Sequence, residues 1–257
     1  MPEFCKVDRD GHVTTITIAR PEVMNAIHPP ASRELSEAFD AFAADPDAWV
    51  AILTGAGDKA FSAGNDLKFQ AAGNRVDGPP TGFAGITSRF DLSKPVIAAV
   101  NGLALGGGFE IVLACDIAVA SEKASFGLPE PRVGLAALAG GLHRLPRQIG
   151  TKPAMGMLLT GRRVDAREAL ALGIVNEVVA HGDVIAAARR WADAICECSP
   201  VSVRTTKRVA LDGLAHASLE DAMGARYPAI VELVKSEDFV EGPRAFAQKR
   251  KPNWTGK

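Results

Sequence analysis

Apolar and polar residues follow two different periods along this chain. Residues His12–Ile18 alternate, with Val13, Ile16 and Ile18 apolar, which is typical of a half-buried strand. Across Ser32–Ala44 the apolar side chains recur at helical spacing instead. The same patterns predict further strands at Val50–Thr54, Lys94–Val100, Ile117–Ala120 and Ile174–Val179, and helices at Ile111–Cys115, Pro146–Leu159, Asp165–Leu172 and Asp183–Cys198.

The order of these elements predicts an α/β fold, because strands alternate with helices along most of the chain. Beyond about Pro200 the pattern is helical, without clear strands. We therefore predict a core at residues 1–199 and a helical subdomain at residues 200–257. Within the core, Gly73–Gly85 is rich in Gly, Pro, Asn and Asp and is interpreted as a mobile loop that could cover a site.

Composition narrows the class of protein. The 257 residues are 47% hydrophobic, which is ample for a large buried core. With a net charge of −1, nothing favours binding to nucleic acid or to an anionic membrane. The longest apolar run, Val96–Ala120, is interrupted by Asn101, several glycines and Glu110, so we expect no membrane span. The N-terminus shows no signal-peptide pattern, and four scattered cysteines suggest no disulfide framework, so we expect a cytoplasmic protein.

The most informative stretch is Asn101–Asp116, NGLALGGGFEIVLACD. Three glycines precede a predicted helix there, and Glu110 stands in its first turn. Glycines allow backbone N–H groups to approach a ligand closely, and a helix N-terminus adds partial positive charge. A second carboxylate, Glu130, follows in FGLPEPRVG at Phe126–Gly134. Together these residues favour proton transfer beside a stabilised oxyanion.

Each carboxylate also has a plainer explanation. A glutamate in the first turn of a helix often only complements the helix dipole, and for Glu110 alone the two explanations are about even. Glu130 lies between Pro129 and Pro131 and could be an acid in a rigid loop. Other chemistries lack their patterns: there is no P-loop, no nucleophile elbow, and no metal spacing among the histidines. We expect neither a metal nor a separate cofactor.

With these residues placed, the chain resembles the crotonase (enoyl-CoA hydratase/isomerase) superfamily. The likeness runs almost end to end, and its order and spacing are specific. Within the superfamily, the motifs SAG-x-DLK and TGRR and the C-terminal EGPRAFAQKRKPNW look like the crotonobetainyl-CoA hydratase (carnitinyl-CoA dehydratase) relatives. The motifs are RPEVMNAI at Arg20–Ile27, GAGDKAFSAGNDLK at Gly55–Lys68, KPVIAAVNGLALGGGFEIVLACD at Lys94–Asp116, FGLPEPRVG, LTGRRVDAREALALGIVNEVV at Leu159–Val179 and EGPRAFAQKRKPNW at Glu241–Trp254.

The resemblance implies a superhelix of strand–strand–helix turns with a helical C-terminal region that packs into homotrimers, often paired as hexamers. It implies an acyl-CoA thioester as substrate, so that CoA belongs to the substrate. Two backbone N–H groups, matching Asn65 and Gly107, would hold the thioester oxygen as an enolate forms. Glu110 and Glu130 match the two glutamates that handle water and the proton at Cα.

The resemblance also carries over contacts to CoA. Lys59 and Lys68 match basic positions near the phosphates and ribose, and Ala63 and Leu67 match backbone contacts to adenine. Phe246 and Lys249 match C-terminal residues that reach the CoA of a neighbouring subunit. Asn65 stands where many hydratases have Ala and where the crotonobetainyl-CoA relatives tend to have Trp.

The implied activity is that of an enoyl-CoA hydratase, a hydro-lyase, giving a 3-hydroxyacyl-CoA. Two alternatives stay within the fold: carnitinyl-CoA dehydration (crotonobetainyl-CoA hydration) and isomerisation of an enoyl-CoA. For the first, Phe69, Phe83 and Phe90 are candidate contacts to a trimethylammonium group. A third alternative is a non-catalytic homologue that binds RNA or a protein partner, which should carry a basic stripe that this chain lacks.

Overall fold

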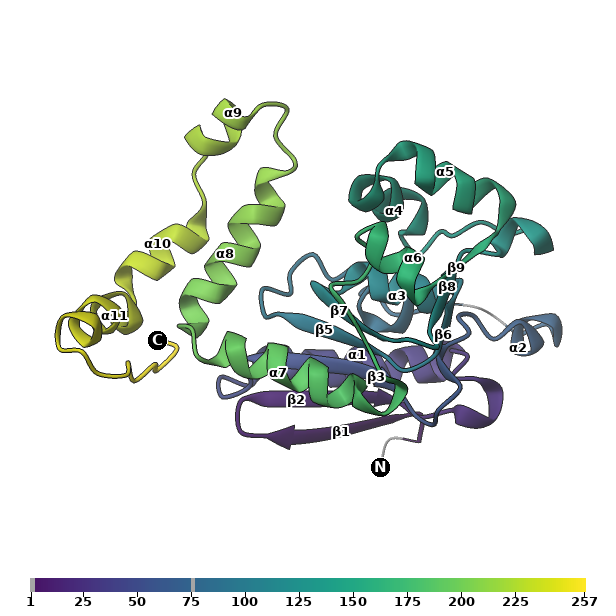
Figure 1. Ribbon diagram of the computed structural model, residues 1–257, viewed down its shortest axis with the longest axis horizontal. Coiled ribbons are helices and arrows are strands. Elements are labelled where there is room, and N and C mark those ends of the chain that lie inside the picture. The colour runs from purple at the N-terminus through teal and green to yellow at the C-terminus, as the bar shows by residue number, and fades with distance from the viewer. Residues whose placement is uncertain (1–2, 75–76) are drawn as a thin grey trace.

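A computed structural model describes residues 3–74 and 77–257 (Figure 1). Its larger sheet has six strands in the order β1-β2-β3-β5-β7-β10. All neighbours are parallel except the hairpin β1–β2. These strands are β1 (Cys5–Asp10), β2 (Val13–Ile18), β3 (Val50–Gly55), β5 (Val96–Val100), β7 (Ile117–Ser121) and β10 (Glu177–Val179).

A second, smaller sheet has the order β4-β6-β8-β9, with β8 and β9 antiparallel. Its strands are three residues long: β4 (Ala60–Ser62), β6 (Leu103–Leu105), β8 (Ser125–Gly127) and β9 (Arg163–Asp165). The helices of the core are α1 (Pro29–Ala44), α2 (Leu67–Ala71), α3 (Gly107–Ala114), α4 (Gly141–Ile149), α5 (Thr151–Thr160), α6 (Ala166–Ala171) and α7 (Val184–Cys196). Short 3-10 turns lie at Pro21–Val23, Phe83–Gly85 (η2), Glu130–Val133 (η3) and His181–Asp183.

The predicted superhelix is confirmed by the order in which strands join the two sheets. A strand in the large sheet, a strand in the small sheet and a helix follow one another three times: β3, β4, α2; then β5, β6, α3; then β7, β8, α4. Because each round adds parallel neighbours to both sheets, the ends of β4, β6 and β8 come together. The segments that follow these three strands hold Asn65, Gly107, Glu110 and Glu130.

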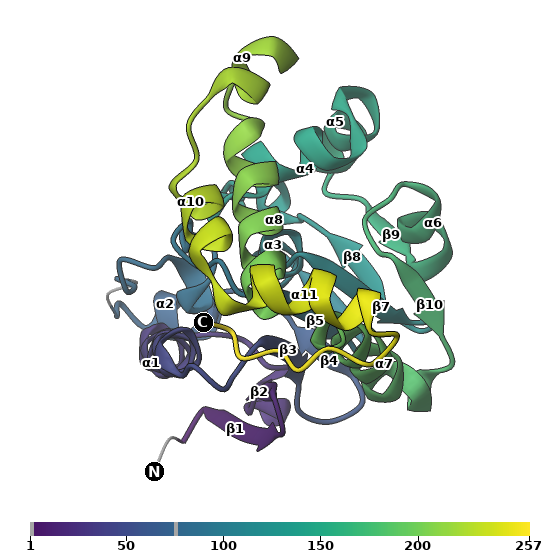
Figure 2. The ribbon, with the colours of Figure 1, turned by 90° about the vertical axis from the view of Figure 1, so that its left-hand side faces the viewer.

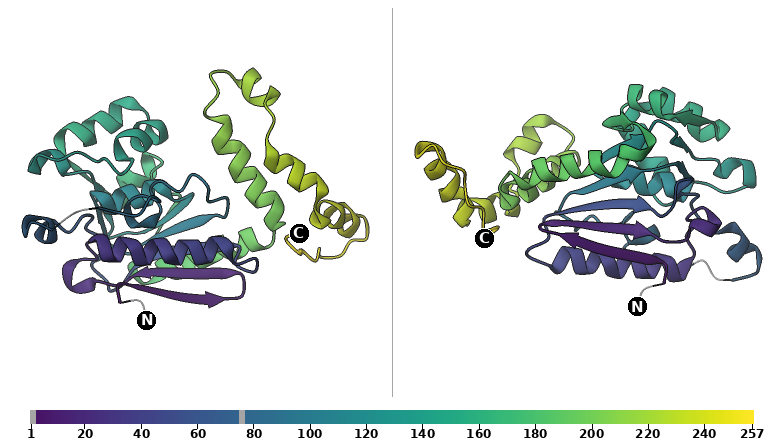
Figure 3. Two further views of the ribbon diagram at one scale, coloured as in Figure 1. Left: turned by 180° about the vertical axis from the view of Figure 1, so that it is seen from behind. Right: turned by 60° about the horizontal axis from the view of Figure 1, so that its bottom comes forward.

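The two faces of the large sheet bury different sets of side chains. Ile52 of β3 and Ile97 of β5 pack toward α7, against Ala187 and other small residues. The alternate residues, such as Leu53, point to the opposite face, where α1 lies (Figure 3, left). This alternation follows from the two-residue period of a strand and explains why both strands consist mainly of apolar residues. Phe61, Phe109 and Phe126 join the small sheet and α3 to the same core.

The C-terminal helices stand off from the sheets at one end of the molecule (Figures 1 and 2). They are α8 (Pro200–Gly213), α9 (Leu219–Gly224), α10 (Pro228–Lys235) and α11 (Glu237–Ala247), which we call the helical arm. Lys207 on α8 ties the arm to the core, because its Nζ lies 2.7 Å from Asp116 Oδ2. The division of the chain at residue 199 stays a prediction.

Several predicted elements differ from the observed ones. The single helix at Pro146–Leu159 is wrong: α4 begins at Gly141 and ends before Gly150, whose φ of 80° breaks the helix. Only the last three residues of the predicted strand Ile174–Val179 pair in the sheet. The hairpin strand β1 and the four short strands of the small sheet were not predicted.

The predicted mobile loop Gly73–Gly85 is ordered at its end. Residues 75 and 76 lie outside the described part of the chain. The turn η2 is fixed against α1, where Ser32 Oγ accepts a hydrogen bond from Ala84 N at 2.9 Å. None of the described helices is long and apolar enough to cross a membrane.

Candidate active site

The site is built around the turn that joins β6 to α3. Gly106 has a φ of 55°, a conformation that favours glycine, and its N–H donates to Gly127 O at the end of β8. Gly108 lies so close to β4 that an added Cβ would come 2.1 Å from Ser62 O. The glycines therefore let α3 start directly against the ends of two neighbouring strands.

The segment after β4 meets the start of α3 at Gly64. A Cβ on Gly64 would lie 2.7 Å from the amide nitrogen of Gly107, so the backbone of the Gly64–Asn65 peptide runs beside the helix N-terminus. Among the described residues, the N–H groups of Asn65 and Gly107 donate to no protein oxygen. Two unbonded N–H donors close together, one at a helix N-terminus, form a potential oxyanion-binding site.

Glu110 lies in the first turn of α3 and is almost fully buried, with 4% of its surface exposed. Its Oε1 accepts a hydrogen bond of 2.8 Å from the N–H of Gly141, the first residue of α4. Burial, together with the negative charge of Glu130, raises the pKa of Glu110 to about 7, against the lowering effect of the Gly141 N–H. Near neutral pH this carboxyl can therefore hold or release a proton.

Glu130 begins the turn η3 and reaches the same point from β8. A Cβ on Gly106 would lie 3.0 Å from Glu130 Oε1, so the carboxyl group rests against the glycine triplet. Within the described part of the chain, its other oxygen, Oε2, is buried and has no hydrogen-bond partner. Burial also raises the pKa of Glu130. A buried oxygen without a partner is available to accept a proton, or a hydrogen bond from a water molecule, when a substrate is bound.

Apolar groups close the site on two sides. The ring of Phe83 in η2 packs against Gly107, where an added Cβ would come 2.5 Å from Phe83 Cε1. Around Gly141 lie Leu128 and Ala137, whose nearest carbons would be 3.0 and 2.9 Å from an added Cβ. The two carboxyl groups thus face a largely apolar space beside two amide donors.

The structure brings together four predicted site residues: Asn65, Gly107, Glu110 and Glu130. The predicted CoA contacts are more dispersed. Lys59, Leu67 and Lys68 are exposed, and Ala63 is half-buried, with its N–H bonded to Met24 O at 2.9 Å. Lys59 also lines a cavity of about 290 Å³ with Pro21, Glu22, Met24, Asn25 and residues 56–60.

Phe246 and Lys249 are not brought to the site within one chain. Both belong to the far end of the helical arm, whereas α2, which carries Lys68, lies at the opposite end of the molecule (Figure 1). Phe246 is 87% exposed. Any contact of these two residues with CoA requires a second copy of the chain.

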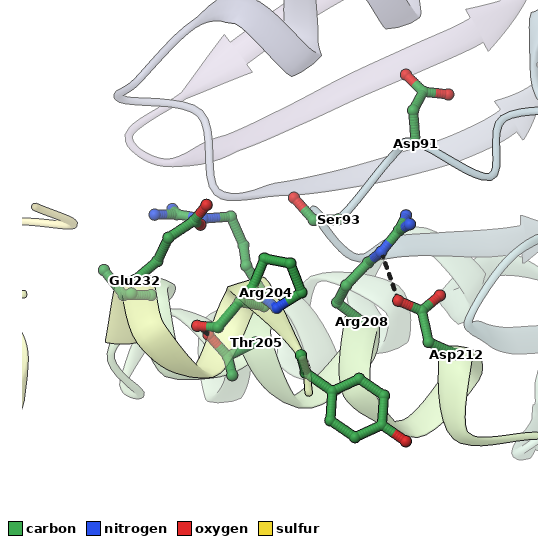
Figure 4. Close-up of a pocket in the computed structure, with 11 residues that line it drawn as sticks. Asp91, Ser93, Arg204, Thr205, Arg208, Asp212 and Glu232 are labelled. Carbon is green, nitrogen blue, oxygen red and sulfur yellow. Dashed lines mark hydrogen bonds and ion pairs between the residues drawn. The ribbon is translucent and has the colours of Figure 1, made fainter. Parts of the chain in front are cut away.

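A larger cavity, of about 410 Å³, lies away from the glycine triplet, between the arm and the core (Figure 4). Arginines and carboxylates alternate on its walls, and Arg208 Nε is paired with Asp212 at 3.0 Å. The cavity is therefore lined by charged groups of both signs. No group of three or more His, Cys, Asp or Glu within residues 3–74 and 77–257 is placed to hold a metal ion.

Two residues near Glu110 were missed by sequence reasoning: Gly141, which donates to its carboxylate, and Arg144, one turn further along α4. The pair Gly140-Gly141 ahead of LHRL repeats, more weakly, the pattern of glycines before a helix at Gly106–Gly108. That repetition could have indicated a second place where backbone N–H groups at the start of a helix come close to another group. Nothing in the sequence connected it to Glu110.

Comparisons with known proteins all find the same kind of relative, and they match nearly the whole chain. A family model described as enoyl-CoA hydratase/isomerase matches residues 8–257. A carnitinyl-CoA dehydratase from Salmonella arizonae is 43% identical over 265 residues, covering all of both chains. The crystal structure of an enoyl-CoA hydratase from Mycobacterium marinum superposes with a TM-score of 0.93 at 40% identity, covering all of both chains. That of a carnitinyl-CoA hydratase from Mycobacterium avium gives 0.79 at 43% identity, covering 99% of each.

Proposed function

The chain belongs to the enoyl-CoA hydratase/isomerase family, and from this we propose that it adds water reversibly to a 2-enoyl-CoA, giving a 3-hydroxyacyl-CoA. The resemblance drawn from the motifs is thereby confirmed. Hydratase or dehydratase chemistry on an acyl-CoA thioester is common to the family match and to these relatives. The particular enoyl-CoA and the roles of individual residues belong to the proposal.

One arrangement supports the proposal most directly: two unbonded amides and two carboxyl groups of raised pKa converge at the glycine triplet. In our proposal the thioester oxygen accepts hydrogen bonds from the N–H groups of Asn65 and Gly107. As water adds to Cβ, negative charge develops on that oxygen. Preorganised donors at such a position are worth about 3–4 kcal/mol each.

The two carboxyl groups handle the protons. The oxygen of water forms a bond to Cβ while the electrons of the double bond move through Cα to the thioester oxygen. One carboxylate takes the proton lost by water, and the other carboxyl delivers a proton to Cα as the enolate collapses. Glu110 and Glu130 suit this exchange because burial keeps the pKa of each above its ordinary value.

Carnitinyl-CoA dehydration is the second candidate, and relatives named for that activity favour it. The aromatic residues near the site give less support to the binding of a trimethylammonium group. The guanidinium of Arg144 already lies 5.7 Å from the centre of the Phe90 ring, and Phe69 packs edge-on against His28. Of the three candidates, Phe83 is the one that packs against Gly107.

We also propose a homotrimer, or a hexamer made of two trimers, in which the arm of one chain completes the CoA site of the next. The arm exposes large apolar side chains, among them Leu214, Met223 and Phe246. Such a surface is typical of an interface between subunits. In this assembly Phe246 and Lys249 would join the Lys59, Ala63, Leu67 and Lys68 of a neighbouring chain. A cytoplasmic location stays a prediction.

The test is turnover of three thioesters: crotonyl-CoA, crotonobetainyl-CoA and a 3-enoyl-CoA. We expect fast loss of the enoyl-thioester absorbance with crotonyl-CoA, collapse of the rate in Glu130→Gln with CoA binding intact, and no change in the control Glu122→Gln, whose side chain is exposed. Preference for crotonobetainyl-CoA would favour the second candidate. The proposal that this chain is an enzyme would be contradicted if no thioester were turned over. Binding to RNA that is unchanged in Glu130→Gln would contradict it as well.

A further inference from the structure

The segment at residues 87–91 runs past the site and is held by three arginines. Its own Arg89 is nearly buried and reaches back to Asp40 of α1 at 2.5 Å. Arg208 of α8 donates to Phe90 O from the arm side. Arg144 of α4 donates from the site side, with Nη2 lying 2.9 Å from Thr87 O. The segment thus joins α1, the arm and α4.

Arg144 makes a further contact with this segment, because its guanidinium lies 5.7 Å from the centre of the Phe90 ring. Cation–π contacts of this kind are attractive and become stronger when water is excluded. The same guanidinium lies beside Gly140, since its Nη1 would come 2.2 Å from a Cβ added to that residue. Gly140 immediately precedes the residue that donates to Glu110.

We propose that Arg144 is a positioning residue, which fastens the start of α4 to residues 87–91 and thereby holds the Gly141 N–H against the Glu110 carboxylate. This inference rests on the proposed function, since it concerns the same carboxyl group. Arg144 acts through Gly141 and through its charge, and it does not touch the reacting atoms. None of the roles implied by the family motifs involves it.

The charge of Arg144 has a consequence with a definite sign. The groups that face Glu110 are the N–H groups of Gly141 and Ala139, the negative Glu130 and the positive Arg144. Burial and Glu130 raise the pKa of Glu110, whereas the other three lower it. Arg144 itself faces Glu110 and the buried thiol of Cys115, whose pKa burial keeps well above its ordinary value. Removing the positive charge should therefore move the titration of Glu110 to higher pH.

The experiment compares Arg144→Met, which removes charge and hydrogen bonds, with Arg144→Lys, which keeps the charge but loses the planar fork. Arg147→Met is the matched control, because Arg147 lies on the same helix, is exposed and, among the residues that the structure describes, hydrogen-bonds only to His143 O. The titration of Glu110 is followed without substrate, as the carboxyl band in the infrared spectrum that Glu110→Gln abolishes. The same variants are assayed for kcat and KM with crotonyl-CoA across pH.

We expect the Glu110 titration to move up by about 0.5–1 pH unit in Arg144→Met, and to move little in Arg144→Lys or Arg147→Met. The limb of the pH–rate profile that belongs to Glu110 should move in the same direction. In both Arg144 variants kcat should fall at least about tenfold, with KM changed less, because the acid is misplaced while CoA is still bound. A merely structural role would lower the amount of folded protein without moving the titration.

An unmoved infrared titration in folded Arg144→Met, or equal shifts in Arg144→Met and Arg147→Met, would overturn the inference. Should Arg144→Met fail to fold, wild-type kcat in Arg144→Lys would overturn the positioning role. Because the infrared titration needs no turnover, it separates this inference from the proposed function. A wild-type protein that hydrates no thioester would contradict the function alone.

Discussion

The start of α3 and the turn η3 face each other across Gly106, and they are held in opposite ways. Glu110 is buried in a helix whose glycines touch β4, and its carboxylate is fixed by Gly141 N–H. Glu130 sits on a four-residue turn and leaves one buried oxygen without a partner among the described residues. One acid is therefore positioned by the fold, whereas the other keeps an oxygen available for a ligand.

The largest difference in stability between α3 and η3 should appear when a glycine in or beside each of them is replaced by alanine. Gly108→Ala places a Cβ 2.1 Å from Ser62 O, which only a backbone shift can relieve, so we expect a loss of about 3 kcal/mol or more in unfolding free energy. Gly134→Ala at the end of η3 meets nothing within 4 Å and strains only a φ of 72°. It should cost about 1 kcal/mol. Urea denaturation measures both, and equal losses would contradict the contrast.

The next effect concerns the cost of burying Glu110. Its pKa is about 7 in the fold and 4.5 ordinarily, so the fold favours the neutral acid. The stability that this gives is fully present below pH 4.5 and is lost as pH rises through 7. We therefore expect Glu110→Gln to be more stable than wild type at pH 8, by on the order of 3 kcal/mol, with the difference vanishing near pH 4.5.

Urea denaturation of wild type and Glu110→Gln at both pH values checks this expectation. Glu130→Gln provides the comparison from η3. Burial raises the pKa of Glu130 as well, so Glu130→Gln should also be more stable than wild type at pH 8. The gain in unfolding free energy should be smaller than for Glu110→Gln, because Glu130 is less buried. A Glu110→Gln variant that is less stable than wild type at pH 8 would show that the carboxylate is not strained by its burial.

A smaller effect tests how closely the apolar wall fits the start of α3. Gly107→Ala drives a methyl group into Phe83, and displacing the neighbouring amide should lower kcat/KM by about tenfold to 100-fold. Phe83→Ala added to it should restore much of the loss, because it removes the clash. Steady-state assays of the two single variants and the double variant measure this. If the double variant were no more active than Gly107→Ala, the clash with the Phe83 ring would not be the cause of the lost activity.

The smallest effect separates backbone from side chain at Asn65. The proposed role needs only its N–H, so Asn65→Ala should remove one hydrogen bond, from Nδ2 to Gln70 Oε1 at 2.8 Å. We expect a loss of about 1 kcal/mol in stability and no more than about fivefold in kcat/KM, with Gln70→Ala behaving alike. A loss of 100-fold or more, the size expected for a missing oxyanion donor, would give the side chain a role of its own.

Glu110 and Glu130 could be selected from the sequence because each lies in a short glycine- or proline-rich motif, whereas Asn65 and Gly107 were assigned through the family resemblance. The glycines and Glu110 share one helix start, and Glu130 begins a turn made rigid by its prolines. The contacts of Gly141 and Arg144 could not be predicted, because they depend on how α4 packs against α3 and residues 87–91. The small sheet was missed since strands of three residues show no period, and the break at Gly150 was missed because a single glycine can also occur inside a helical pattern.

The central claim is that Glu110 and Glu130 act as one unit on the same substrate. Its most direct test is the rate of crotonyl-CoA hydration in Glu110→Gln, Glu130→Gln and the double variant. We predict that each single variant loses about 10²–10⁴-fold in kcat, and that the double variant loses little more than the worse single variant. Losses that multiply in the double variant, or one single variant that keeps nearly full activity, would contradict the claim.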